Sequence, residues 1–169
     1  MNIEEAIKTA IEYEERVTAV YMKYADKFTS ENGTKIFKTL GKEEEEHVAY
    51  LKEKQVQLKA SGTISFDGYE SVVPDAATLK ANIKNLKKIA KLPNIDEEVK
   101  YFEKALDMEI ETSNFYKDMV KQLPKEHQPL FERFVEIEEG HEAIVRAEID
   151  AARGLGFWFD FQEFDLESA

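Results

Sequence analysis

Cysteine is absent from the 169-residue sequence, and glycine and proline are scarce, with seven and four residues. Without cysteine there can be no disulfides, thiolate nucleophiles, iron–sulfur clusters or cysteine-rich zinc sites, so a metal ion must be held by Asp, Glu and His. The scarcity of turn-forming residues argues against an all-β fold. No apolar run approaches the roughly 18 residues of a membrane span. The N-terminal MNIEEAIKTAIEYEE also lacks the regions of a secretory signal. We therefore expect a soluble, cytoplasmic protein.

Positive charge is also in short supply, because 35 Asp and Glu residues face 23 Lys and Arg residues, which gives a formal net charge of −12. Such a surface repels nucleic acid phosphates and anionic membranes, so we expect neither as a partner. The acidity serves solubility alone, or some of the carboxylates bind cations. With 43% hydrophobic residues, the chain has enough apolar side chains for one sizeable core.

Four long segments show the apolar periodicity of amphipathic helices, at about residues 2–28, 34–59, 94–122 and 124–153. Residues 29–33 are predicted as a turn, and Pro124 as part of the first turn of the last helix. Residues 61–93 are predicted as a long crossover that contains a short lysine-rich helix. Two antiparallel helix hairpins joined in this way predict an all-α, ferritin-like four-helix bundle over residues 1–153. The aromatic residues 154–169 are expected to pack on the bundle or on a second subunit.

The two predicted hairpins repeat the same ionisable residues. The first helix matches the third at an offset of 95, and the second matches the fourth at an offset of 94. The shared polar positions are Glu14 and Glu109, Tyr21 and Tyr116, Glu44 and Glu138, and His47 and His141. Each hairpin therefore supplies one Glu, one Tyr and one E-x-x-H motif.

The repeated residues have the composition of a two-metal site. Residues i and i+3 share a helix face, so the Glu and His of each E-x-x-H can ligate from one side. Four Glu and two His in a bundle core form the ligand set of di-iron and di-manganese carboxylate proteins. A single E-x-x-H motif more often lies on a solvated helix face. Two such motifs in register with Glu14 and Glu109 are hard to explain by chance. These two glutamates interrupt apolar stripes, where an unpartnered carboxylate costs roughly several kcal/mol.

Other ionisable residues have simpler interpretations. Glu43, Glu45 and Glu46 are expected to be solvated, because they point away from the face of the E-x-x-H glutamate. Glu111 is expected off the site face, and His127 at the surface.

Tyr21 and Tyr116 each lie two helical turns from the Glu of their helix. Two roles stay open for them: core packing with a satisfied hydroxyl, or donation of a hydrogen bond to a ligand carboxylate or to bound peroxide.

The motifs resemble those of the rubrerythrin family of the ferritin-like superfamily. The resemblance implies that two iron ions bind per chain, or manganese in their place, and that hydrogen peroxide or dioxygen is reduced, with Tyr21 and Tyr116 as candidate catalytic residues. It also implies a homodimer and a separate, rubredoxin-like electron-donor protein. The implied ligands are Glu14 and His47 for one iron, Glu109 and His141 for the other, and Glu44 and Glu138 as bridges.

Two features depart from the family pattern. The sequence has no cysteine and hence no rubredoxin domain, so its electron donor is expected to be external. Peroxidase-type sites also carry a further carboxylate three residues after the third-helix Glu, where this chain has Thr112, whose repeat mate is Val17. The symmetric set is similar to bacterioferritin ferroxidase centres, which leaves a ferroxidase or iron-handling protein as one alternative. A metal-free helical interaction module is another.

Overall fold

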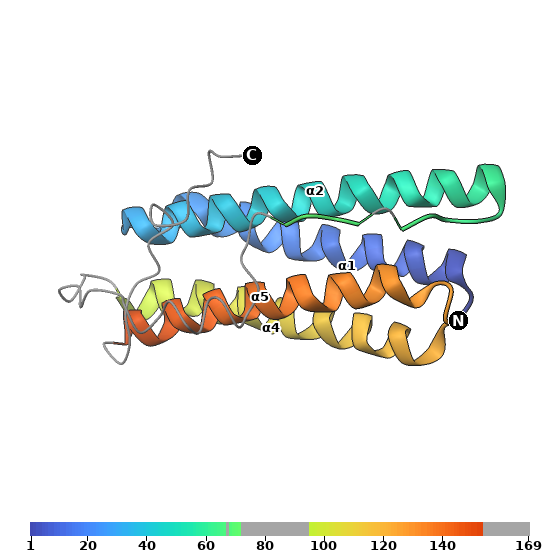
Figure 1. Ribbon diagram of the computed structural model, residues 1–169. Coiled ribbons are helices and arrows are strands. Elements are labelled where there is room, and N and C mark those ends of the chain that lie inside the picture. Colours follow the sequence, from blue (N-terminus) through green and yellow to red (C-terminus); the bar gives the residue numbers. More distant parts are fainter. Residues whose placement is uncertain (67, 72–94, 154–169) are drawn as a thin grey trace.

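The computed structural model describes residues 1–66, 68–71 and 95–153, which form four long helices (Figure 1). The helices are α1 (Ile3–Tyr24), α2 (Glu31–Ser61), α4 (Ile95–Gln122) and α5 (Gln128–Ala152), with a short 3-10 helix η1 (Ala25–Lys27) after α1. α1 and α2 form one antiparallel hairpin, α4 and α5 form the other, and the two hairpins lie side by side. The predicted ferritin-like four-helix bundle is confirmed. The predicted crossover helix and the aromatic tail lie outside the described residues.

Side-chain caps fix both ends of the first hairpin. Asn2 and Glu5 form a capping box at the start of α1, with reciprocal bonds of 2.9 and 3.1 Å. α2 begins three residues earlier than predicted, because the Ser30 hydroxyl accepts a hydrogen bond from the Gly33 backbone N–H at 3.2 Å. Gly62 ends α2 with a φ of 73°, a left-handed conformation that favours glycine.

The start of α5 differs from the sequence prediction. The helix begins at Gln128, and Pro129 rather than Pro124 occupies its first turn. Proline is tolerated there because the first backbone N–H groups of a helix have no intrahelical partner. Pro124 instead opens a turn in which its carbonyl accepts a hydrogen bond from His127 N at 2.9 Å.

The apolar core consists of two clusters separated along the bundle axis. One cluster lies toward the end of α1 and the start of α2 and includes Phe37 and Phe102, which are fully buried. The other lies toward the start of α1 and the end of α2 and includes Leu51, Phe131 and Phe134. The middle turns of all four helices lie between these clusters, so polar side chains that point inward there are shielded from water on both sides.

Glu98 of α4 ties the second hairpin to the start of α2. Its carboxylate is 2% exposed and accepts hydrogen bonds from the backbone N–H groups of Thr29 and Ser30 at 2.8 and 3.0 Å. The hydroxyls of the same two residues donate to it at 2.6 and 2.5 Å. Burial opposes ionisation of Glu98, but these bonds prevail and lower the pKa of the carboxyl below its usual range.

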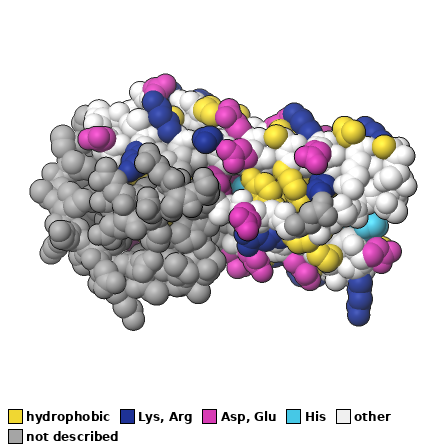
Figure 2. Space-filling view, turned by 45° about the horizontal axis from the view of Figure 1, so that its top comes forward, with side chains coloured by type: hydrophobic (Ala, Val, Ile, Leu, Met, Phe, Trp, Pro, Cys, Tyr) yellow, Lys and Arg dark blue, Asp and Glu magenta, His cyan; other side chains and the backbone are white. Residues whose placement is uncertain are grey.

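The outside of the bundle is charged. On the face drawn in Figure 2, Asp and Glu side chains are interspersed with Lys and Arg side chains. None of the described helices is both long and apolar enough to cross a membrane.

Candidate metal centre

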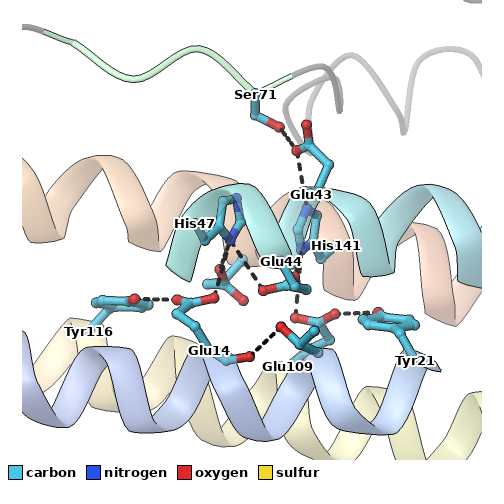
Figure 3. Close-up of polar contacts among 11 residues, drawn as sticks. Glu14, Tyr21, Glu43, Glu44, His47, Ser71, Glu109, Tyr116 and His141 are labelled. Atoms are coloured by element: carbon cyan, nitrogen blue, oxygen red, sulfur yellow. Dashed lines mark hydrogen bonds and ion pairs between the residues drawn. The ribbon is translucent and has the colours of Figure 1, made fainter. Parts of the chain in front are cut away.

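Six ionisable side chains meet in the middle of the bundle, each of them fully buried (Figure 3). α1 and α4 each supply one glutamate, and α2 and α5 each supply one Glu and one His from an E-x-x-H motif. The six are Glu14, Glu44, His47, Glu109, Glu138 and His141. The structure therefore brings together all six residues that the repeat singles out.

The ring of His47 faces three carboxylates through one nitrogen. Its Nδ1 lies 3.2 Å from Glu14 Oε2, 3.2 Å from Glu44 Oε2 and 3.7 Å from Glu138 Oε1. Nδ1 is thus the atom through which His47 can join these carboxylates around one ion.

His141 presents the matching nitrogen from the other hairpin. Its Nδ1 lies 2.7 Å from Glu44 Oε1 and 3.7 Å from Glu109 Oε2. The imidazole rings of His141 and His47 are nearly parallel, with an interplanar angle of 8° and centroids 5.5 Å apart. The two histidines therefore stand side by side, each aimed into the same carboxylate layer.

One group of candidate ligand atoms joins Glu43 to His47 and His141. The six residues of the layer form two further groups, each with one atom from each of four residues and all atoms within 4.8 Å of one another. These two groups share two carboxylates, one from α2 and one from α5, as two adjacent ions with bridging carboxylates would require. Their members are Glu14, Glu44, His47 and Glu138 in one, and Glu44, Glu109, Glu138 and His141 in the other.

Unpaired polar atoms inside the layer fit a bound cation. Both carboxylate oxygens of Glu138, Glu109 Oε2 and Glu44 Oε1 are buried without a hydrogen-bond partner among the described residues. His141 Nδ1 lies in ion-pair contact with Glu44 at 2.7 Å but makes no hydrogen bond among the described residues. Buried polar atoms left in this way are costly unless something else binds them. Carboxylate oxygens and imidazole nitrogens together suit iron or manganese.

The layer distributes charge unequally when no ion is bound. Burial opposes ionisation of Glu44, but His47 and His141 hold its pKa well below the usual range. Burial and the charge of Glu44 raise the pKa of Glu14 to about 8, and burial with the neighbouring carboxylates raises that of Glu138 well above its usual value. Although burial disfavours the imidazolium forms, the carboxylates raise the pKa of His47 to about 10 and that of His141 well above its ordinary value. Glu14 and His47 therefore hold protons at neutral pH, and the pKa values of Glu138 and His141 shift in the same direction.

The two repeat tyrosines connect the hairpins. Tyr21 of α1 donates a hydrogen bond to Glu109 of α4, and Tyr116 of α4 donates one to Glu14 of α1. Burial, followed by the charge of the contacted glutamate, raises the pKa of each phenol well above its usual value. Both hydroxyls therefore stay protonated and orient the glutamates across the bundle. Gly41 allows α2 to approach Tyr21, since a Cβ at that glycine would lie 3.0 Å from the tyrosine Cβ.

The structure contradicts the prediction that Glu43 is solvated. Its side chain is 3% exposed, and its Oε2 lies 3.7 Å from His141 Nε2. The same oxygen accepts a hydrogen bond of 2.5 Å from the Ser71 hydroxyl, because the chain after α2 turns back along that helix. Sequence reasoning missed Glu43 since a run of four glutamates gives no sign of which members are covered.

The other ionisable residues considered in the sequence lie outside the six-residue layer. Glu45 and Glu46 are exposed as expected. Glu111 lies off the site and pairs with Arg16 at 3.1 Å. His127 is half-buried at the start of α5, away from the six residues.

Thr112 lies fully buried one turn after Glu109, and its hydroxyl has no hydrogen-bond partner in the described part of the chain. Its position agrees with a side chain directed toward the layer. It offers only a neutral oxygen where a further carboxylate would supply charge.

A family model described as Rubrerythrin matches residues 5–149. Searches of curated proteins and of solved structures gave no match. The matched residues include both hairpins and all six members of the buried layer. The chain therefore belongs to the rubrerythrin family of ferritin-like proteins.

Proposed function

We propose that the chain is a non-haem di-iron oxidoreductase that reduces hydrogen peroxide or dioxygen with electrons from a separate donor protein. Two ligand groups that share Glu44 and Glu138 support this function, because they provide neighbouring positions for two ions. Two iron ions held by the six residues would supply the redox chemistry. Reduction of hydrogen peroxide to two water molecules takes up two electrons and two protons.

The protein side chains prepare the layer for that chemistry. The two apolar clusters exclude bulk water from both ends, which strengthens electrostatic interactions inside. Tyr21 and Tyr116 hold the glutamates that they contact in fixed orientations and supply hydroxyl donors beside the reaction volume. The electron donor is external, because the chain has no cysteine with which to hold a second redox centre of the rubredoxin type.

The test begins with metal-depleted protein loaded anaerobically with ferrous iron. We expect two ions per chain by elemental analysis. We also expect rapid oxidation on mixing with hydrogen peroxide and restored turnover when a reduced rubredoxin is added. Binding of fewer than two ions, or no oxidation by either peroxide or dioxygen, would contradict the proposed function.

A ferroxidase or iron-handling role is the second candidate, favoured by one observation. Thr112 stands where a further carboxylate would make the site unsymmetrical, so the six ligands form two equivalent sets. Assembly separates the two functions. A dimer that holds two ions per chain supports the enzyme, whereas a many-subunit cage that takes up iron beyond that number supports iron handling.

A further inference from the structure

The two halves of the layer differ on the outer side of the histidines, where each ring turns its Nε2 away from the six-residue layer. His141 Nε2 faces a carboxylate at ion-pair distance, 3.7 Å from Glu43 Oε2, without forming a hydrogen bond. His47 Nε2 has no hydrogen-bond partner among the described residues, and the rings of Tyr69 and Phe134 stand edge-on to His47 at 5.5 and 5.2 Å. The Glu43 carboxyl thus pairs with His141, and one of its oxygens also lies within 4.8 Å of a nitrogen of His47, whose ring otherwise has aromatic neighbours.

The internal repeat shows where this difference arises. The offset of 94 that aligns His47 with His141 aligns Glu43 with Ile137. Ile137 is 4% exposed and cannot accept a hydrogen bond. The six ligands obey the repeat, but the residue just before each E-x-x-H glutamate does not.

Glu43 is held in place rather than free to rotate into solvent. Its 3% exposure leaves little room, and Ser71 Oγ donates to the same Oε2 that faces His141 (Figure 3). The segment that carries Ser71 is fixed in turn, since Arg133 Nε donates to the Tyr69 carbonyl at 2.7 Å. A carboxylate at 3.7 Å in such a buried place attracts an N–H strongly, because little water screens the interaction.

We propose that Glu43 is a positioning residue that acts through the outer nitrogen of His141 and makes the metal position served by His141 bind its ion more tightly than the position served by His47. A carboxylate beside the non-ligating ring nitrogen keeps the proton on Nε2, leaves Nδ1 as the ligand atom and raises its basicity. Such an outer partner typically contributes about 10–100-fold to metal affinity. This inference rests on the proposed two-metal function.

The experiment isolates each position by removing the other histidine. His47→Ala leaves the His141 position intact, and His141→Ala leaves the His47 position. Affinity for Co²⁺, a redox-stable probe of nitrogen and oxygen sites, is measured by equilibrium dialysis with elemental analysis. Adding Glu43→Gln should weaken Co²⁺ binding about 10–100-fold in the His47→Ala chain and less than about threefold in the His141→Ala chain.

Three further variants separate contact from charge and from folding. Glu45→Gln removes the same charge from an exposed neighbour and should leave both affinities unchanged. Glu43→Asp keeps a carboxylate and should retain part of the selective effect. Ser71→Ala leaves the Glu43 carboxyl in place but removes its hydroxyl donor, and should weaken Co²⁺ binding selectively at the His141 position by a smaller factor. Circular dichroism on each metal-free variant checks that its helices are intact.

The outcomes distinguish this inference from the function on which it rests. Selective weakening in the His47→Ala chain supports the role of Glu43. Equal weakening in both chains, or none in either, would overturn it while leaving a two-metal protein. If the unmutated chain binds no Co²⁺ at all, the proposed function falls together with the inference.

Discussion

Loading the centre with two divalent ions should release at least two protons at pH 7. Glu14 and His47 hold protons in the metal-free layer at that pH, because their pKa values are raised to about 8 and about 10, and the pKa values of Glu138 and His141 are raised too. Each group must give up its proton to become a ligand through a carboxylate oxygen or Nδ1. Since the pKa of Glu14 is raised only to about 8, the number should be about one lower at pH 9 than at pH 7.

The same count fixes how metal affinity depends on pH. Each released proton changes the overall binding constant for the ion pair about tenfold per pH unit, so the affinity should drop steeply as the pH falls below 7. Calorimetric titration with Mn²⁺ in buffers of different ionisation enthalpy measures the number of protons directly. Glu45→Gln is the matched control, because an exposed carboxyl outside the layer should not alter the count.

A chain that binds both ions and releases one proton or none would refute the reasoning. In that case the histidines and glutamates would already be deprotonated before the metal arrives. The protonation states assigned to the groups around Glu44 would then be wrong.

Four further outcomes follow from the contacts described above. His141→Ala should lose mainly one ion and nearly all turnover while the helices stay intact, as elemental analysis, peroxide assays and circular dichroism would report. Tyr21→Phe should cost the metal-free protein about 1–3 kcal/mol in urea unfolding, because a buried carboxylate loses its donor. Glu98→Ala should cost about 2–4 kcal/mol, whereas the exposed Glu97→Ala should cost little, since only Glu98 binds the start of α2. With a chelator present, the melting temperature should fall as the pH rises from 5 to 8. The reason is that Glu14 in the folded protein keeps its proton up to about pH 8, whereas in the unfolded chain it loses the proton above its ordinary pKa of 4.5. A melting temperature that stays constant or rises over this range would contradict the raised pKa of Glu14.

The repeat in the sequence was enough to predict the bundle and to single out the residues of the layer. Apolar periodicity gave the helices, and the same Glu, Tyr and E-x-x-H recurring at nearly one offset identified the inward polar face. A local pattern succeeds here because residues on one helix face stay together once the helices pack. That these six residues ligate metal stays a prediction.

Contacts between segments distant in sequence could not be predicted in this way. Glu43 is covered because a segment 28 residues later returns along α2 and places Ser71 against it. Glu98 binds the two residues that precede a helix beginning 67 residues earlier, and no local signal marks this contact. The start of α5 was misjudged for a related reason, because Pro124 and Pro129 both suit a first helical turn and only the fold selects Pro129.

The crossed tyrosine contacts have a consequence for how such a centre can diverge. Each hairpin contributes one set of ligands and one tyrosine that reaches the other hairpin, so two copies of one hairpin about a two-fold axis would already contain every ligand. In such a pair every substitution would appear twice, and the two metal positions would have to stay identical. Joining the halves in one polypeptide removes that constraint. Position 43 can then carry a glutamate while its repeat counterpart, position 137, carries an isoleucine, and each ion can acquire an environment of its own.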